Sequence, residues 1–213
     1  LHRSSLARIR SYLAVSMTLL VSATLTLVGN RLDVFFLSYY MDFGQLGVYG
    51  VALRICVVVS IMTAAMSTIV TPRAAAAAAD PAKFRRYVAL SGFYSTIQIV
   101  CAMILLLLIE PLIRIVFGAE YTQAALPASI LIGQVLLLTV GIPFQALIQC
   151  CDRPSRMIYI ALTRLIVNVP LMMLLIPRYS VTGAAVAVTI TTLLMTIVVI
   201  MLNMLDLCFE FLY

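Results

Sequence analysis

The chain has 213 residues, of which 64% are hydrophobic and only 10% are charged, and its formal net charge is +6. A soluble domain carries about 25% charged residues, so this composition excludes a soluble globular protein. Because a helix needs about 20 apolar residues to cross the hydrocarbon core of a membrane, the long apolar runs predict an all-α, polytopic transmembrane bundle.

Membrane-spanning helices are expected in chain order, separated by short polar or proline-containing links. Their approximate ranges are 12–38, 46–70, 87–109, 123–149, 157–176 and 181–203. Residues 1–213 are therefore expected to form a single six-helix transmembrane lobe. An alanine run at 74–79 follows the second span, and since alanine is the best helix former, we expect it to extend that helix.

Basic residues gather in alternate links, and short cytoplasmic loops are rich in lysine and arginine. With the N-terminus inside, Lys83, Arg85 and Arg86 lie in a cytoplasmic link, whereas the outer links hold only Arg114 and Arg178. This pattern predicts a multi-pass protein with both termini in the cytoplasm. The basic cluster is expected to lie at anionic membrane lipids, although a role as topology determinant is enough to explain it.

Charged side chains inside a span cost about 3 kcal/mol unless they face a partner or a hydrated cavity. Arg54 and Arg164 each lie roughly 12 Å along the helix from the nearer interface, and we expect both to line a functional cavity. Structural pairing is the alternative. Arg31 and Asp33 fall near the outer end of the first span, where snorkelling or local pairing explains them as well as a function does.

Amide side chains add to these candidates. Arg164 and Asn168 are four residues apart and share a helix face. The fourth span carries a stripe, interrupted by Pro143, that comprises Gln134, Gly141, Gln145 and Gln149. Amides and arginines with few carboxylates suit an anionic, sugar-like solute. For any single glutamine, however, an interhelical hydrogen bond is the favoured explanation.

The polar residues of the last span indicate helix packing, and the residue types needed for catalysis are scarce. The last span has a small and polar stripe, expected to be a helix–helix contact, at Ala185, Thr189, Thr192, Thr196 and Asn203. The five cysteines show no metal-binding spacing, and the only histidine is His2, so we expect no metal site and no cofactor. Without a nucleophile, acid–base or phosphate-loop motif, the chain is not expected to be an enzyme or to bind nucleic acid.

Local motifs occur in order along most of the chain. Residues 33–54 contain an aspartate in a span followed by G-x-Y-x-x-A-x-R, residues 117–121 read F-G-x-x-Y, and residues 152–154 read D-R-P. Asn168 precedes L-I-P-x-Y-S-x-x-G-A-A at 175–185, with Ser180 in place of a usual glycine. Together these motifs resemble polysaccharide flippases of the multidrug/oligosaccharidyl-lipid/polysaccharide exporter superfamily.

The resemblance implies the C-terminal six-helix lobe of a two-lobe transporter of the bacterial inner membrane. Such proteins move undecaprenyl-pyrophosphate-linked oligosaccharide to the outer leaflet for surface polysaccharide biosynthesis. Because the chain begins with Leu1 rather than methionine, we expect a fragment, a split gene product or a half that pairs with a second copy.

On this hypothesis Arg54 and Arg164, with help from Arg31, bind the pyrophosphate. The sugar hydroxyls are expected to contact Gln134, Gln145, Gln149 and Asn168. Asp33 is the candidate for ion coupling, since it is the only carboxylate expected within a span. Two alternatives stay open: a cation-coupled multidrug antiporter of the same superfamily, and a non-transporting membrane scaffold or subunit.

Overall fold

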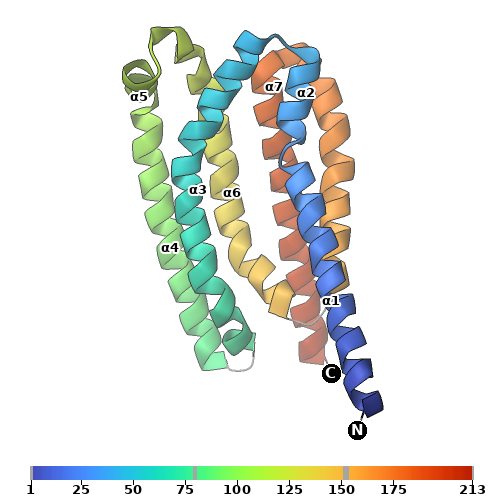
Figure 1. The fold of residues 1–213 in the computed structure, drawn as a ribbon. Coiled ribbons are helices and arrows are strands. Elements are labelled where there is room, and N and C mark those ends of the chain that lie inside the picture. The colour runs from blue at the N-terminus through green and yellow to red at the C-terminus, as the bar shows by residue number, and fades with distance from the viewer. Residues whose placement is uncertain (1, 79–80, 151–153, 213) are drawn as a thin grey trace.

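The computed structural model describes residues 2–78, 81–150 and 154–212, and these form a helical bundle (Figure 1). The elements are α1 (His2–Gly29), α2 (Leu32–Tyr40), α3 (Phe43–Ala78), α4 (Pro81–Leu107), α5 (Ile109–Val116), the 3₁₀ helix η1 (Ala119–Ala124), α6 (Ala125–Cys150) and α7 (Pro154–Leu212). Within these ranges, five helical stretches are long and apolar enough to cross a membrane. The predicted class, an all-α polytopic membrane bundle, is confirmed.

The longest apolar stretch, Ile158–Leu202, has 45 residues, about twice what one crossing requires. It lies in α7, whose two arms run side by side in opposite directions (orange and red in Figure 1). The reversal is at Ser180, where φ is 53° and ψ is −130°, a combination that favours glycine. This stretch therefore supplies two membrane-length arms.

Close packing at the reversal depends on Gly183. A Cβ atom added there would overlap the backbone carbonyl oxygen of Leu175 on the preceding arm. Gly183 is also flanked by the fully buried Ala184 and Ala185. Small residues at this position let the two arms of α7 approach backbone to backbone.

The range predicted for the first span, 12–38, is divided between α1 and α2. Asn30 and Arg31 form the break, and the N–H of Arg31 donates to the carbonyl of Val28 at 3.0 Å. Asp33 therefore lies in the first turn of α2, where the positive end of the helix dipole favours a carboxylate. The alanine run continues α3 as predicted, as far as Ala78, whereas Ala79 lies outside the described residues.

The centre of the bundle is formed by α3 and α6, which pack against each other, against α4 and against α7. The larger core cluster joins α2, α3, α6 and α7, and its fully buried side chains include Leu37, Ile132, Met172 and Ile176. A smaller cluster around Met66 and Tyr87 packs α3 and α4 against α6. Apolar side chains remain on the outside of the bundle, as expected of helices that face lipid.

Candidate substrate-binding groove

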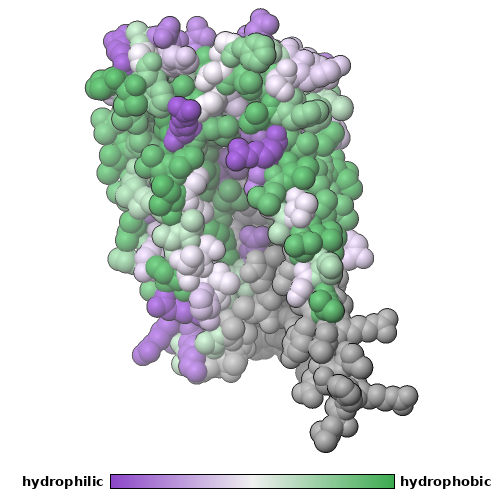
Figure 2. All heavy atoms as spheres, in the orientation of Figure 1, coloured by the Kyte–Doolittle hydropathy of each residue, from purple (hydrophilic) through white to green (hydrophobic). Residues whose placement is uncertain are grey.

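One face of the bundle is open between α1 and α3, which stand apart with α6 and α7 behind them (Figure 1). Packing explains the separation: α1 lies against α7, whereas α3 lies against α4 and α6. Figure 2 shows this face hollowed between the two helices, with hydrophilic atoms in and around the hollow and an apolar surface on either side. We call this feature the groove; α1 and α3 are its walls, and α6 and α7 form its floor.

The side chain of Arg164 lines a cavity of about 80 Å³ between α6 and both arms of α7. Polar residues that share this cavity are Gln145, Thr192 and Thr196. Arg164 is half-buried, and within the described ranges its guanidinium makes no hydrogen bond. Asp33 lies near enough to act on its charge. The hydroxyl of Thr192 already donates to the carbonyl of Val188, so the groups without a hydrogen bond to the described residues are Arg164, Gln145 and Thr196.

Asp33 is buried and hydrogen-bonded. Its Oδ2 accepts a hydrogen bond from the hydroxyl of Tyr49 at 2.6 Å, and its Oδ1 accepts one from the backbone N–H of Val34 at 2.9 Å. Tyr49 is fully buried in the core, so this bond joins α2 to α3 inside the bundle. Arg31 and Arg164 both act electrostatically on the Asp33 carboxylate. Tyr49 is the tyrosine of the G-x-Y-x-x-A-x-R motif, but nothing in the sequence indicated that it is the partner of Asp33.

Replacing Tyr49 by phenylalanine should lower stability by about 1–3 kcal/mol, because a buried carboxylate loses a hydrogen-bond donor while the ring is kept. The measurement is thermal unfolding of the purified protein in detergent. Tyr39→Phe is the matched control, since Tyr39 is 77% exposed. Equal melting temperatures for the two variants would contradict a stabilising role for the Asp33–Tyr49 bond.

The other two arginines predicted to bind the substrate have exposed side chains; they are Arg31 and Arg54. Arg54 lies on α3, between the buried Ala52 and Ile55 but pointing away from the core, and makes no hydrogen bond to the described residues. Arg31 lies at the break between α1 and α2. Among the described residues, the charge predicted at Arg54 thus has no hydrogen-bonding partner.

The structure separates the predicted amides into two groups. Gln134 donates to Thr192 at 3.4 Å and Asn168 accepts from Thr191 at 3.2 Å, so both make contacts between helical segments. Gln145, by contrast, is exposed and shares the cavity of Arg164. The side chain of Gln149 lies outside the described part of the structure, as do residues 151–153 of the D-R-P link.

The described part of the polar stripe in the last span packs against α6, as expected, whereas the side chain of Asn203 lies outside the described part of the structure. Thr189 lies 3.4 Å from the carbonyl oxygen of Ile130, and a Cβ on Gly141 would lie 3.5 Å from the hydroxyl of Thr196. Thr192 and Thr196 also line the Arg164 cavity, a placement that sequence analysis missed. Their helical spacing indicated a common face, but not which neighbouring side chain that face meets.

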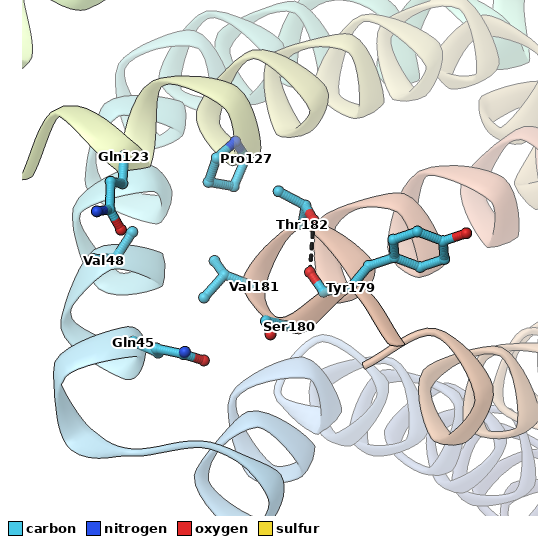
Figure 3. A pocket seen from close by; sticks show the side chains of 8 residues that line it. All are labelled: Gln45, Val48, Gln123, Pro127, Tyr179, Ser180, Val181 and Thr182. Carbon is cyan, nitrogen blue, oxygen red and sulfur yellow. Dashed lines mark hydrogen bonds between the residues drawn. The ribbon is translucent and has the colours of Figure 1, made fainter. Parts of the chain in front are cut away.

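A second polar cavity, of about 250 Å³, lies beside the reversal of α7 (Figure 3). Its lining includes Gln45 from α3, Gln123 from η1 and Ser180. Gln45 points toward the reversal, whereas the ring of Tyr179 points away from the cavity (Figure 3). The Thr182 hydroxyl donates to the carbonyl of Tyr179 at 2.6 Å and closes the turn. No sequence signal singled out these amides, because they come from segments far apart in the chain.

A solved structure shares the fold of the chain. The fold is similar to a structure described as the outward-facing conformation of a multidrug resistance MATE family transporter of the MOP superfamily, with a TM-score of 0.69. Sequence identity is 15%, and the match covers 87% of this chain and 42% of that chain. The chain thus shares the fold of part of that transporter and spans less than half of its length.

The family follows from the sequence itself. Residues 2–126 match the model of the family described as polysaccharide biosynthesis protein, and the chain belongs to that family. The predicted identification as a polysaccharide flippase-type exporter is confirmed at this level. Curated protein sequences contain no match to the chain.

Proposed function

We propose that the chain is one lobe of a transporter that translocates undecaprenyl-pyrophosphate-linked oligosaccharide across the bacterial inner membrane for surface polysaccharide biosynthesis. The observation that carries the proposal is the half-buried Arg164, which lines a small cavity with Gln145 and makes no hydrogen bond to the described residues. Membership of the polysaccharide biosynthesis family supports the same substrate class.

A guanidinium in this position is suited to a diphosphate. Its planar fork can bind two phosphate oxygens at once, and a low-dielectric site strengthens the interaction. The cavity of about 80 Å³ is too small for an oligosaccharide, so only a small part of the substrate enters it. The sugars lie along the groove, near the amide of Gln145 and the hydroxyls of Thr192 and Thr196, and the lipid tail stays in the bilayer.

In this proposal Asp33 helps to release the substrate from Arg164. Its carboxylate attracts the Arg164 guanidinium without a direct ion pair, so it offsets part of this charge when the groove is empty. A bound diphosphate competes with Asp33 for the guanidinium. A cation or proton that neutralises Asp33 then favours substrate binding, which makes Asp33 the ion-coupling residue of the proposed cycle.

A second six-helix lobe completes the transporter in this proposal. Arg54 shares its side of α3 with the exposed Val58 and Ile61, and an arginine left facing lipid would cost about 3 kcal/mol. A partner lobe, from a separate chain or a second copy, covers this surface and encloses the groove. Rocking of the two lobes then exposes the site to each side of the membrane in turn.

The same fold leaves one rival function, a cation-coupled multidrug antiporter. Buried Asp33 favours it, because a carboxylate inside a membrane bundle can bind a proton or sodium ion. The Arg164 guanidinium and the Gln145 amide, which line one cavity, favour an anionic sugar substrate instead.

Reconstituted vesicles distinguish the two functions. The complete transporter is placed in liposomes with a fluorescent diphosphate-linked oligosaccharide in one leaflet, and its appearance in the other leaflet is followed with an added glycosidase. We expect protein-dependent transfer and no ethidium accumulation under an imposed proton or sodium gradient. Gradient-driven ethidium transport without sugar transfer would establish the antiporter, and neither activity would favour a membrane scaffold.

A further inference from the structure

A cationic cavity lies at the opposite end of α3 from the reversal of α7, where α3 ends and α4 begins. Its volume is about 320 Å³, and it is lined by Arg73, Ala76, Lys83, Arg86, Tyr87 and Leu90. Hydrophilic side chains gather at this end of α3 and α4 in Figure 2. None of the lining residues lines the Arg164 cavity, and the described residues that line this cavity include no carboxylate.

Two helices supply the positively charged side chains of this cavity. Arg73 comes from the last turns of α3, and one of its N–H groups donates to the carbonyl of Ile69 at 3.3 Å, which leaves further donors available. Lys83 and Arg86 come from the first turns of α4, three residues apart and therefore on one face. Arg85, between them, does not line the cavity.

The floor of the cavity is apolar and rigid. Tyr87 is 3% exposed, and its hydroxyl donates to the carbonyl of Pro143 in α6 at 2.7 Å. Leu90 continues the same face of α4, and Ile97, one heptad further into the membrane, is 38% exposed. A ligand seated here would thus meet three positive charges at the end of the bundle and an apolar track along α4.

We propose that this cavity binds the headgroup of an anionic membrane phospholipid. Its phosphate accepts hydrogen bonds from Arg73, Lys83 and Arg86, while an acyl chain lies along Leu90 toward Ile97. Three cations from two helices match a phosphodiester at the membrane surface, and the apolar track matches a lipid rather than a free phosphate ion. Bound lipid would join the ends of α3 and α4 and, through Tyr87, hold them against α6.

Native mass spectrometry of the purified full chain in detergent tests this site, with phosphatidylglycerol or phosphatidylcholine added. We expect one phosphatidylglycerol retained in preference to phosphatidylcholine. Arg73→Gln and Arg86→Gln should each weaken retention about five- to tenfold, since a cation at the headgroup contributes about this factor. Arg86→Lys, which keeps the charge, should retain most of the affinity.

Arg85→Gln is the matched control, because it removes the same charge from the same helix turn outside the cavity. If Arg85→Gln weakens retention as much as Arg86→Gln, the attraction is diffuse and the site is refuted. Equal retention of phosphatidylcholine, or full competition by glycerol phosphate without acyl chains, would also overturn the proposal. If Arg73→Gln does not fold, the comparison of Arg85→Gln with Arg86→Gln tests the site alone. Both side chains are exposed, so neither change should prevent folding.

Discussion

Alanine at position 164 should reduce transfer of the diphosphate-linked oligosaccharide at least about thirtyfold in the complete transporter. Truncating one member of a buried, hydrogen-bonded charge pair costs about 2–5 kcal/mol, and 2 kcal/mol corresponds to about this factor. The cavity beside Arg164 offers no second cation among its described lining residues that could take over the role. The measurement is the initial rate of transfer in reconstituted vesicles.

Two further variants show whether the effect of Arg164→Ala is specific to the charge and shape of this side chain. Arg164→Lys keeps the charge but loses the planar fork, so its transfer rate should fall between those of the wild type and Arg164→Ala. Arg178→Ala removes an exposed arginine near the reversal of α7 that does not line the Arg164 cavity, and this variant should transport normally. A normal rate for both Arg164→Ala and Arg54→Ala, with normal protein levels, would show that neither arginine binds the substrate.

Gly183→Ala should destabilise the protein by about 3 kcal/mol or more. The new Cβ would overlap the carbonyl oxygen of Leu175 and lie 2.7 Å from its carbonyl carbon. Overpacking against a flexible side chain costs about 1–3 kcal/mol, and backbone in a tight reversal has less room to yield. Thermal unfolding in detergent, with the folded yield from membranes, measures the effect.

Two control variants distinguish this clash from a general effect of substitution on stability. Gly92→Ala in α4 adds a Cβ with no neighbouring atom within 4 Å, and it should be neutral or raise stability by about 1 kcal/mol. Ser180→Gly should also stabilise, because the φ of 53° at Ser180 favours glycine. If Gly183→Ala melts at the same temperature as Gly92→Ala, the two arms of α7 do not approach as closely as described.

The sequence alone determined the class of this protein. Apolar runs of membrane length and scarce charge require helices in lipid, because unpaired backbone groups are too costly there. Motifs such as G-x-Y-x-x-A-x-R and F-G-x-x-Y indicated a polysaccharide family, and the family match confirms it. Depth along a helix follows from a rise of about 1.5 Å per residue, which is why Arg54 and Arg164 could be selected from sequence.

Tertiary structure alone decided which of these residues meet. Periodicity defines a face within one helix, but the neighbour of that face depends on packing between helices, which small residues and close van der Waals contacts direct in a membrane. Only the packed helices therefore show that Tyr49 is the partner of Asp33. They also show that Gln145 shares the cavity of Arg164, whereas Gln134 bonds to Thr192.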